Sequence, residues 1–307
     1  MNLNGVIPAN ILPLREDLSI DEPAYRRHVQ WLAATNGVVA ITCNGHAAEV
    51  AALNKQERRA AVAMAAKAIG GRIPLIAGIY AENHIHAIDL ARDAQAEGAS
   101  ALLVFPVPVL SLGGRQEMAY RHVAAIAEAV PLPMVVFSYA AFTGMAYDME
   151  TLERICAIDT VIGVKEWSLD IRIHERTRDM LQGLPRPVAL LTSFSTNLLP
   201  ALASGADGIL SGHGSVIADI QAQLLTAVKA NDLVAAKQIY ARIKPLTDVI
   251  YQSPMANMYA RMKEHLIMMG HEMTSAVRPP LERVDEPERR RLRQALQDSG
   301  LAHGCRS

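Results

Sequence analysis

The sequence predicts an α/β fold, a (β/α)8 TIM barrel with a helical extension at its C-terminal end. Eight short apolar runs recur at intervals of roughly 20 to 35 residues, and an amphipathic, alanine-rich segment follows each, which is typical of parallel βαβ units. The runs are hydrophobic at nearly every position rather than at alternate ones. Continuous hydrophobicity indicates strands that are buried on both faces, as the strands of a barrel are.

The predicted elements follow one another in a regular order. The eight expected strands cover residues 5–9, 38–42, 73–78, 101–105, 134–139, 161–164, 188–191 and 208–210. Asp21 and Pro23 open the first helix with an acidic cap and a proline in the first turn. Asn54 opens the second helix, and Glu57 three residues later completes a capping box. Gly37 ends the first helix before the second strand.

The pattern changes after the eighth expected strand. Residues 215–270 indicate three helices without strands between them, and a last helix is expected over 286–299. We therefore predict a barrel over residues 1–230 and a helical extension over 231–307 that packs on it as one structural unit. The total of 307 residues suits a barrel of about 250 residues with such an addition.

Composition excludes several classes of function. The net charge of −1 offers no electrostatic basis for binding nucleic acid or an anionic membrane. No stretch reaches the ~18 apolar residues that a membrane span needs, and the N-terminus lacks a basic and apolar leader. Cys43, Cys156 and Cys305 have no metal-like spacing. These observations predict a soluble, cytoplasmic protein with reduced cysteines.

Lys165 is the main candidate for catalysis. It directly follows the expected strand 161–164, and active sites of such barrels lie at the C-terminal ends of the strands. Desolvation there lowers the pKa of an amine, which leaves free amine to attack a carbonyl. The alternative is a structural lysine paired with Glu166. A second candidate is the loop 43–49, where Gly45 permits close backbone approach and the next helix supplies N–H groups for a carboxylate.

Taken in order, these segments resemble the dihydrodipicolinate synthase / N-acetylneuraminate lyase family. Residues 45–49 occupy the place of its G-T/S-T-G-E loop, and 163–166 are similar to its G-[IV]-K-[ED] segment. Residues 132–144 resemble the fifth-strand block that ends in T-G, and 205–211 resemble the G-A-x-G-x-I-S eighth strand. Residues 261–264 and 278–281 resemble C-terminal pieces of the family, so the likeness covers essentially the whole chain.

The resemblance implies a mechanism. Lys165 condenses with pyruvate, or with the keto end of a longer 2-oxo acid, to a protonated imine, and no other cofactor and no metal is expected. The imine is an electron sink, so the C3 proton or the C3–C4 bond can be lost to give an enamine. The resemblance also implies a homotetramer or a homodimer. The residues expected to contact the substrate are Gly45, Ala47, Ala48, Glu49, Phe137, Phe142 and Leu210.

The sequence departs from the family at its proton-moving groups. Two anchors, 132–133 and 143–144, both place the family tyrosine on Phe137, which cannot move a proton. Tyr139 lies two residues later, on the same side of the strand. The threonine hydroxyls of the loop are missing, and His46, which titrates near neutrality, takes one position. We predict that His46, with Tyr139, performs the acid–base chemistry; the alternatives are a drifted site, with Tyr139 as a substrate contact or a packing residue.

The partner end of the pocket is predicted to be apolar. Phe142 stands where the synthase branch has an arginine for its aldehyde's carboxylate, and residues 105–110 replace the tyrosine pair after the fourth strand. We therefore expect an aldolase, or a hydratase-aldolase or dehydratase, that acts on an apolar or aromatic aldehyde half. Dihydrodipicolinate synthesis is not expected.

Two rival functions remain open. A metal-dependent lyase is suggested by His84 and His86 with His46 and Glu49, but at helical spacing His84 and His86 point about 200° apart, which favours surface histidines. The other rival is a degenerate barrel that binds a 2-oxo acid as a sensor or structural subunit. Retention of Lys165 argues against it, because a buried lysine without a role is costly.

Overall fold

A computed structural model describes residues 1–301 and confirms the predicted barrel. The strands are β1 (Val6–Pro8), β2 (Ile41–Cys43), β3 (Leu75–Ile79), β4 (Ala101–Val104), β5 (Met134–Tyr139), β6 (Val161–Trp167), β7 (Ala189–Thr192) and β8 (Gly208–Ser211). They pair in parallel in the order β1-β8-β7-β6-β5-β4-β3-β2. Parallel bridges between Val6 and Val38 and between Ala9 and Thr42 close the circle from β1 to β2.

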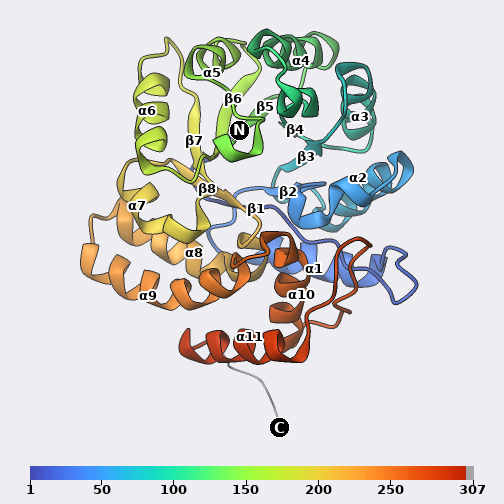
Figure 1. The fold of residues 1–307 in the computed structure, drawn as a ribbon, viewed down its shortest axis with the longest axis vertical. Coiled ribbons are helices and arrows are strands. Elements are labelled where there is room, and N and C mark those ends of the chain that lie inside the picture. The colour runs from blue at the N-terminus through green and yellow to red at the C-terminus, as the bar shows by residue number, and fades with distance from the viewer. Residues whose placement is uncertain (302–307) are drawn as a thin grey trace.

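Helices surround the strands on the outside of the barrel (Figure 1). They are α1 (Glu22–Ala34), α2 (Lys55–Ile69), α3 (His84–Ala96), α4 (Gln116–Ala129), α5 (Met149–Cys156), α6 (Ile171–Gln182), α7 (Leu198–Ala203) and α8 (Gly214–Lys229). The predicted N-terminal caps are present: Asp21 accepts from the Ala24 N–H at 3.2 Å, and Asn54 and Glu57 form a complete capping box. The expected cap at Gly37 is wrong, because α1 already ends at Ala34 and Thr35 after it is extended. The helix starts therefore lie where the sequence signals place them.

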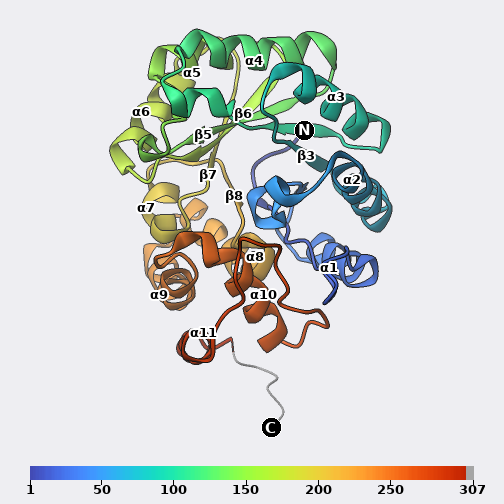
Figure 2. The ribbon, with the colours of Figure 1, turned by 45° about the vertical axis from the view of Figure 1, so that its right-hand side comes forward.

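The C-terminal layer consists of α9 (Leu233–Ile250), α10 (Met258–Met268) and α11 (Glu286–Asp298). It lies on the side of the barrel formed by α1 and α8 (Figures 1 and 2). Arg261 fastens this layer together, because its guanidinium donates to Glu288 at 2.6 Å and to the carbonyl groups of Ile250 and Gln252 at 2.9 and 2.7 Å. The expected boundary near residue 230 falls between α8 and α9, and Cys305 lies outside the described residues.

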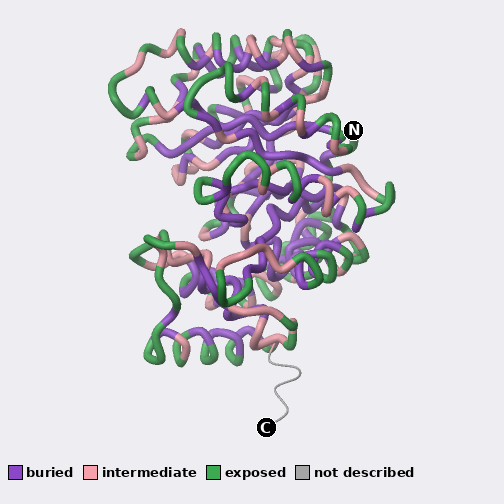
Figure 3. The backbone as a smooth tube through the Cα atoms, turned by 90° about the vertical axis from the view of Figure 1, so that its right-hand side faces the viewer, coloured by how far each residue is buried: buried purple, intermediate pink, exposed green. Residues whose placement is uncertain are grey.

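The buried backbone is concentrated in the strands at the centre of the barrel, and the outer helices carry the exposed residues (Figure 3). One apolar cluster fills the barrel interior and includes Ile7, Leu103, Phe137, Tyr139 and Leu210. A larger cluster lies between the strands and the helices. Within residues 1–301, no helix combines the length and the hydrophobicity that crossing a membrane requires.

Strand β6 is longer than predicted, and the expected end at residue 164 is wrong. Lys165 pairs in register with Phe137 of β5 and with Leu191 of β7, and Trp167 still pairs with Tyr139. A charged residue usually marks the end of a buried strand. Here the strand continues, because Lys165 and Glu166 point to opposite faces of the sheet and each finds room on its own face. Lys165 therefore lies within the strand, in the barrel interior, rather than after it.

Candidate active site

Lys165 is buried near the C-terminal end of β6, with 4% of the residue exposed. Its Nζ lies 3.9 Å from the centre of the Phe137 ring, and no carboxylate among residues 1–301 forms an ion pair with it. Burial lowers the pKa of its amine to about 7. The alternative that Lys165 pairs with Glu166 is wrong, because Glu166 faces the opposite side of the strand and pairs with His174. A large fraction of the Lys165 amine is therefore uncharged and nucleophilic near neutral pH.

This pKa predicts the pH dependence of any attack by the amine. Only the neutral amine attacks, and its fraction rises about tenfold per pH unit well below pH 7 and is nearly complete above pH 8. An exposed lysine would instead keep gaining neutral amine up to pH ~10. We expect the rate of imine formation, measured by reductive trapping from pH 5 to 10, to level off near pH 8. A rate that rises steadily to pH 10 would contradict the assigned environment.

His46 and Tyr139, which the sequence pairs as proton carriers, form a hydrogen bond between His46 Nε2 and Tyr139 Oη. His46 opens the short 3-10 helix η1 (His46–Ala48) after β2, and Tyr139 ends β5. Desolvation, together with the nearby charge of Lys165, lowers the pKa of His46 to about 3. Burial raises the pKa of Tyr139 well above its usual value. The expectation that His46 titrates near neutrality is therefore wrong for this state of the site, and both groups are neutral.

Aromatic rings explain this strong desolvation. The His46 ring contacts Phe105 edge to face, with 5.0 Å between ring centres, and lies 6.0 Å from both Tyr80 and Phe137. Tyr139 lies 4.5 Å from Phe137. Such a wall has a low dielectric and offers few hydrogen-bond partners, so it disfavours any charged form of His46 or Tyr139.

A small cavity of about 50 Å³ brings Lys165 and His46 together with residues from the C-terminal layer, whereas Tyr139 reaches it only through its hydrogen bond to His46. Its lining residues are Ala9, His46, Ala47, Phe137, Lys165, Trp167, Ser193, Gly212, Tyr251, Met258 and Met262. A larger hollow of about 690 Å³ lies around the N-terminal residues and the start of β7, but Arg178 and Arg186 there donate to backbone carbonyl groups. The chemistry is therefore assigned to the smaller cavity.

Seven lining residues were not predicted from the sequence: Ala9, Trp167, Ser193, Gly212, Tyr251, Met258 and Met262. Trp167 lies two residues after Lys165 and faces the same side of β6, so strand alternation alone could have identified it. Tyr251 follows α9, and Met258 and Met262 belong to α10. No local pattern connects these three residues with Lys165, because the C-terminal layer reaches the cavity only through the fold.

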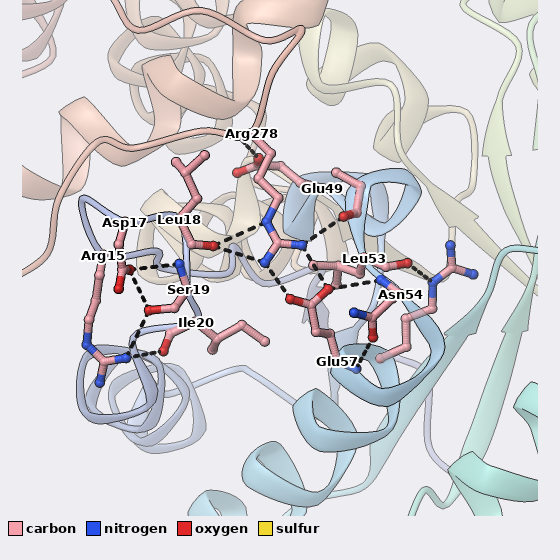
Figure 4. Close-up of polar contacts among 12 residues, drawn as sticks. Arg15, Asp17, Leu18, Ser19, Ile20, Glu49, Leu53, Asn54, Glu57 and Arg278 are labelled. Atoms are coloured by element: carbon pink, nitrogen blue, oxygen red, sulfur yellow. Dashed lines mark hydrogen bonds and ion pairs between the residues drawn. The ribbon is translucent and has the colours of Figure 1, made fainter.

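The structure separates Glu49 from the cavity, contrary to the expected substrate contact. Its carboxylate accepts from Lys263 Nζ at 2.5 Å and from the Arg278 N–H at 3.0 Å. Arg278 also donates to the Leu18 carbonyl at 2.9 Å and to Glu57 at 2.5 Å, and Figure 4 shows it reaching across these groups. Glu49 thus ties the loop 45–49 to the C-terminal layer instead of facing the substrate.

Phe142 and Leu210 also lie outside the cavity lining. Phe142 belongs to the 3-10 helix η4 (Ala141–Thr143), is 70% exposed, and lies 6.1 Å from Trp167 between ring centres. The structure therefore places Phe142 on the surface and not in the lining of the cavity. Leu210 is fully buried in the barrel interior, and Gly45 and Ala48 line no part of the cavity. Of the expected substrate contacts, the structure places Ala47 and Phe137 against it.

The buried pair of Lys263 and Glu49 gives a prediction for stability. Both side chains are almost fully buried, at 0% and 2% exposure. Replacing Lys263 with Met should lower the free energy of unfolding by about 3–5 kcal/mol, because a buried carboxylate loses its cation. Lys244→Met is the control: it breaks the exposed pair with Asp248 and should cost less than about 1 kcal/mol. Urea unfolding measures both variants. Equal losses of unfolding free energy would contradict a larger stabilising effect of the buried pair of Lys263 and Glu49.

The histidine pair of the metal alternative lies on α3. Asn83 caps this helix through the His86 N–H at 3.0 Å, and both His84 and His86 are exposed. The helical spacing and the surface position predicted for these two histidines are therefore confirmed. Among residues 1–301, no three His, Cys, Asp or Glu side chains are grouped so that they could hold a metal ion.

Comparisons with known proteins agree with this architecture. The model of the dihydrodipicolinate synthetase family matches residues 2–299. A 4-hydroxy-tetrahydrodipicolinate synthase of Halorhodospira halophila is 31% identical over 283 residues, which cover 92% of this chain and 91% of that protein. A protein with the same description from Syntrophus aciditrophicus is 28% identical over 297 residues, or 97% and 98% of the two chains.

Solved structures show the same likeness. A chloride-inhibited dihydrodipicolinate synthase of Acinetobacter baumannii, complexed with pyruvate, superimposes with a TM-score of 0.87. It is 27% identical, and the match covers 98% of this chain and all of that one. A monomeric dihydrodipicolinate synthase variant gives a TM-score of 0.89 at 25% identity over 97% of each chain.

Proposed function

Because the chain belongs to the dihydrodipicolinate synthetase family, we propose that Lys165 forms a Schiff base with pyruvate or another 2-oxo acid. Membership supports a lyase of the aldolase type. The observation that carries the proposal is the state of Lys165: its amine is buried, has no carboxylate partner within the described residues, and has a pKa of about 7. Such an amine is a nucleophile at neutral pH. Beyond the imine itself, the proposal needs no cofactor.

The proposed reaction begins when the neutral Lys165 amine attacks the keto carbon. One proton must then move from the nitrogen to the former carbonyl oxygen. The hydrogen-bonded pair of His46, which lines the cavity, and Tyr139 takes this proton from the nitrogen and returns one to the oxygen, so that the pair ends as it began. Loss of water then takes up one further proton from solvent and leaves a protonated imine. The imine accepts the electron pair of the C3–H or the C3–C4 bond, and an enamine results.

The lining supports an apolar or aromatic partner half. Trp167, Met258 and Met262 bound the cavity, and the polar side chains among its lining residues are Lys165, His46, Ser193, Tyr251 and, through its indole N–H, Trp167. Besides Lys165, no lysine or arginine is among the described lining residues. A second carboxylate on the substrate would therefore have no cation to bind. We propose that the physiological partner differs from that of the curated synthases, whose name does not transfer to this chain.

A substrate screen tests the proposed class. Pyruvate release is measured from 2-oxo acids with aryl or alkyl substituents, and apolar, aromatic and carboxylate-bearing aldehydes are tested with pyruvate in reverse. Aryl or alkyl substrates should have the highest kcat/KM. Comparable or higher kcat/KM with a carboxylate-bearing aldehyde would overturn the apolar assignment.

Replacing Trp167 tests the proposed apolar side of the cavity more directly. Trp167→Ala should lower kcat/KM for an aryl or alkyl substrate by about tenfold or more, because it removes apolar contact area from the partner half. Imine formation with pyruvate alone should change little. Ile85→Ala, which removes an exposed apolar side chain of α3 outside the cavity, is the matched control and should leave both quantities unchanged. Equal effects of the two variants on kcat/KM would contradict the proposed contact between Trp167 and the partner half of the substrate.

A second function is favoured by one observation, Phe137 in the place of the family tyrosine. In that case the chain is a barrel that binds a 2-oxo acid covalently as a sensor or structural subunit. Borohydride trapping alongside the substrate screen separates the two functions. A covalent adduct on Lys165 without turnover of any 2-oxo acid supports the binding function.

The assembly and location follow as proposals from the family. We propose a homotetramer or a homodimer, and the exposed Leu112 and Phe142, at 86% and 70%, supply apolar surface near the barrel mouth that an interface would cover. Light scattering at micromolar concentration measures the assembly. A cytoplasmic location stays a prediction.

A further inference from the structure

A buried polar pair lies directly behind Lys165, on the outer face of β6. Glu166 and His174 of α6 are both fully buried, and His174 Nδ1 lies 2.8 Å from Glu166 Oε2. The second carboxylate oxygen, Oε1, accepts from the Ser168 N–H at 2.6 Å. On the other side of the ring, His174 Nε2 lies 3.0 Å from the Ala201 carbonyl oxygen of α7. All four polar atoms of the pair are thus engaged.

These contacts determine how many hydrogens the two side chains carry between them. A carbonyl oxygen can only accept, so His174 Nε2 must carry a hydrogen and donate it to Ala201. The contact between Nδ1 and Oε2 then holds one further proton, on either the imidazole or the carboxyl group. In both arrangements the pair is neutral overall and fully hydrogen-bonded. A buried polar pair of this kind fixes one geometry, because any displacement leaves a polar atom without a partner.

Glu166 connects three residues of the cavity wall. Its chain neighbours in β6 are Lys165 and Trp167, which alternation turns to the opposite, cavity side. Its backbone carbonyl accepts from the Ser193 N–H at 2.8 Å, and Ser193 also lines the cavity. Fixing Glu166 from α6 and α7 therefore fixes the backbone from which the amine, the indole and the Ser193 hydroxyl project.

We propose that Glu166 and His174 are positioning residues for the imine-forming Lys165. They hold the end of β6 so that the amine meets the keto carbon in the attacking geometry, for which small displacements cost large factors in rate. Neither residue lines the cavity, so they act through the backbone of β6. The proposal rests on the function proposed for Lys165.

Three variants test the role. Glu166→Gln preserves the contacts, because the amide can accept from Ser168 and donate to a neutral His174 Nδ1; its imine formation rate should stay within about threefold of the wild type. His174→Phe removes the partner of Oε2 and should slow imine formation by about tenfold or more. The double variant Glu166→Leu with His174→Leu leaves no buried polar side chain at the pair, should fold, and should be slow as well.

The readout is the rate constant for borohydride-trapped adduct at saturating pyruvate, measured on the full chain. Loss of folded protein lowers the amplitude of the adduct, whereas mispositioning lowers its rate constant. His122→Phe is the matched control, since His122 of α4 is equally buried and no residue of α4 lines the cavity; its rate constant should be unchanged. Wild-type rate constants in His174→Phe and in the double variant would overturn the positioning role. A wild-type protein that forms no adduct would instead refute the function proposed for Lys165.

Discussion

Replacing Lys165 with Met should abolish turnover and, at the same time, stabilise the protein. Methionine has a similar length and suits a buried apolar site, but it cannot form an imine. The turnover number should fall by roughly 10³-fold or more, as when a covalent nucleophile is removed. The free energy of unfolding should rise by on the order of 2 kcal/mol, because a buried amine without a carboxylate partner in the described residues is removed. Steady-state kinetics and urea unfolding measure the two effects.

The sign of the stability effect depends on pH. Since burial depresses the pKa of Lys165 from 10.5 to about 7, the folded state binds fewer protons than the unfolded state between these values. The destabilisation by Lys165 is therefore greatest below pH 7 and fades as the pH rises towards 10.5. The advantage of Lys165→Met should shrink accordingly between pH 7 and 10. A variant that is less stable than the wild type at pH 7 would indicate that Lys165 has a stabilising partner.

Replacing His46 with Ala should lower turnover by about 10²-fold or more, the usual contribution of a general acid–base group. His46 is the group to which the hydroxyl of Tyr139 can pass its proton, and the ring of Phe137 cannot take over. Tyr139→Phe should cost a similar factor. The double variant should be little worse than either single variant, because the two groups act as one unit. The measurement is kcat on the best substrate of the screen.

The control for this prediction is the trapping of pyruvate on Lys165. Both variants keep Lys165, so borohydride should still trap pyruvate on it, although more slowly. Unchanged turnover in His46→Ala would remove His46 from the acid–base chemistry, and additive losses in the double variant would mean that the two groups act separately.

Much of the fold could be predicted from local signals. Continuous apolar runs gave the strands, and the Asn54 cap with Glu57 gave the start of α2, because burial and capping act over a few neighbouring residues. The end of β6 could not be predicted in this way. Whether a strand tolerates Lys165 and Glu166 depends on what lies on its two sides, and His174 comes from a later helix.

The site was predictable only in part, for the same reason. The parallel order of the strands brings the loop with His46, the end of β5 with Tyr139 and the end of β6 with Lys165 to one end of the barrel, and the structure places His46 and Tyr139 in contact. The carboxylate of Glu49 turns to Lys263, a partner 214 residues away, which no loop motif reveals. Met258 likewise reaches the cavity from the C-terminal layer, so its contribution depends on packing between distant segments.

Borohydride trapping with pyruvate, followed by peptide mass spectrometry, tests the central claim most directly. The full chain is incubated with pyruvate near pH 8, where most of the Lys165 amine is neutral, and is then reduced. We expect one covalent adduct, on the peptide that contains Lys165, and none in Lys165→Met. Absence of an adduct with pyruvate and with every other 2-oxo acid, or an adduct on a different lysine, would contradict the Schiff-base function.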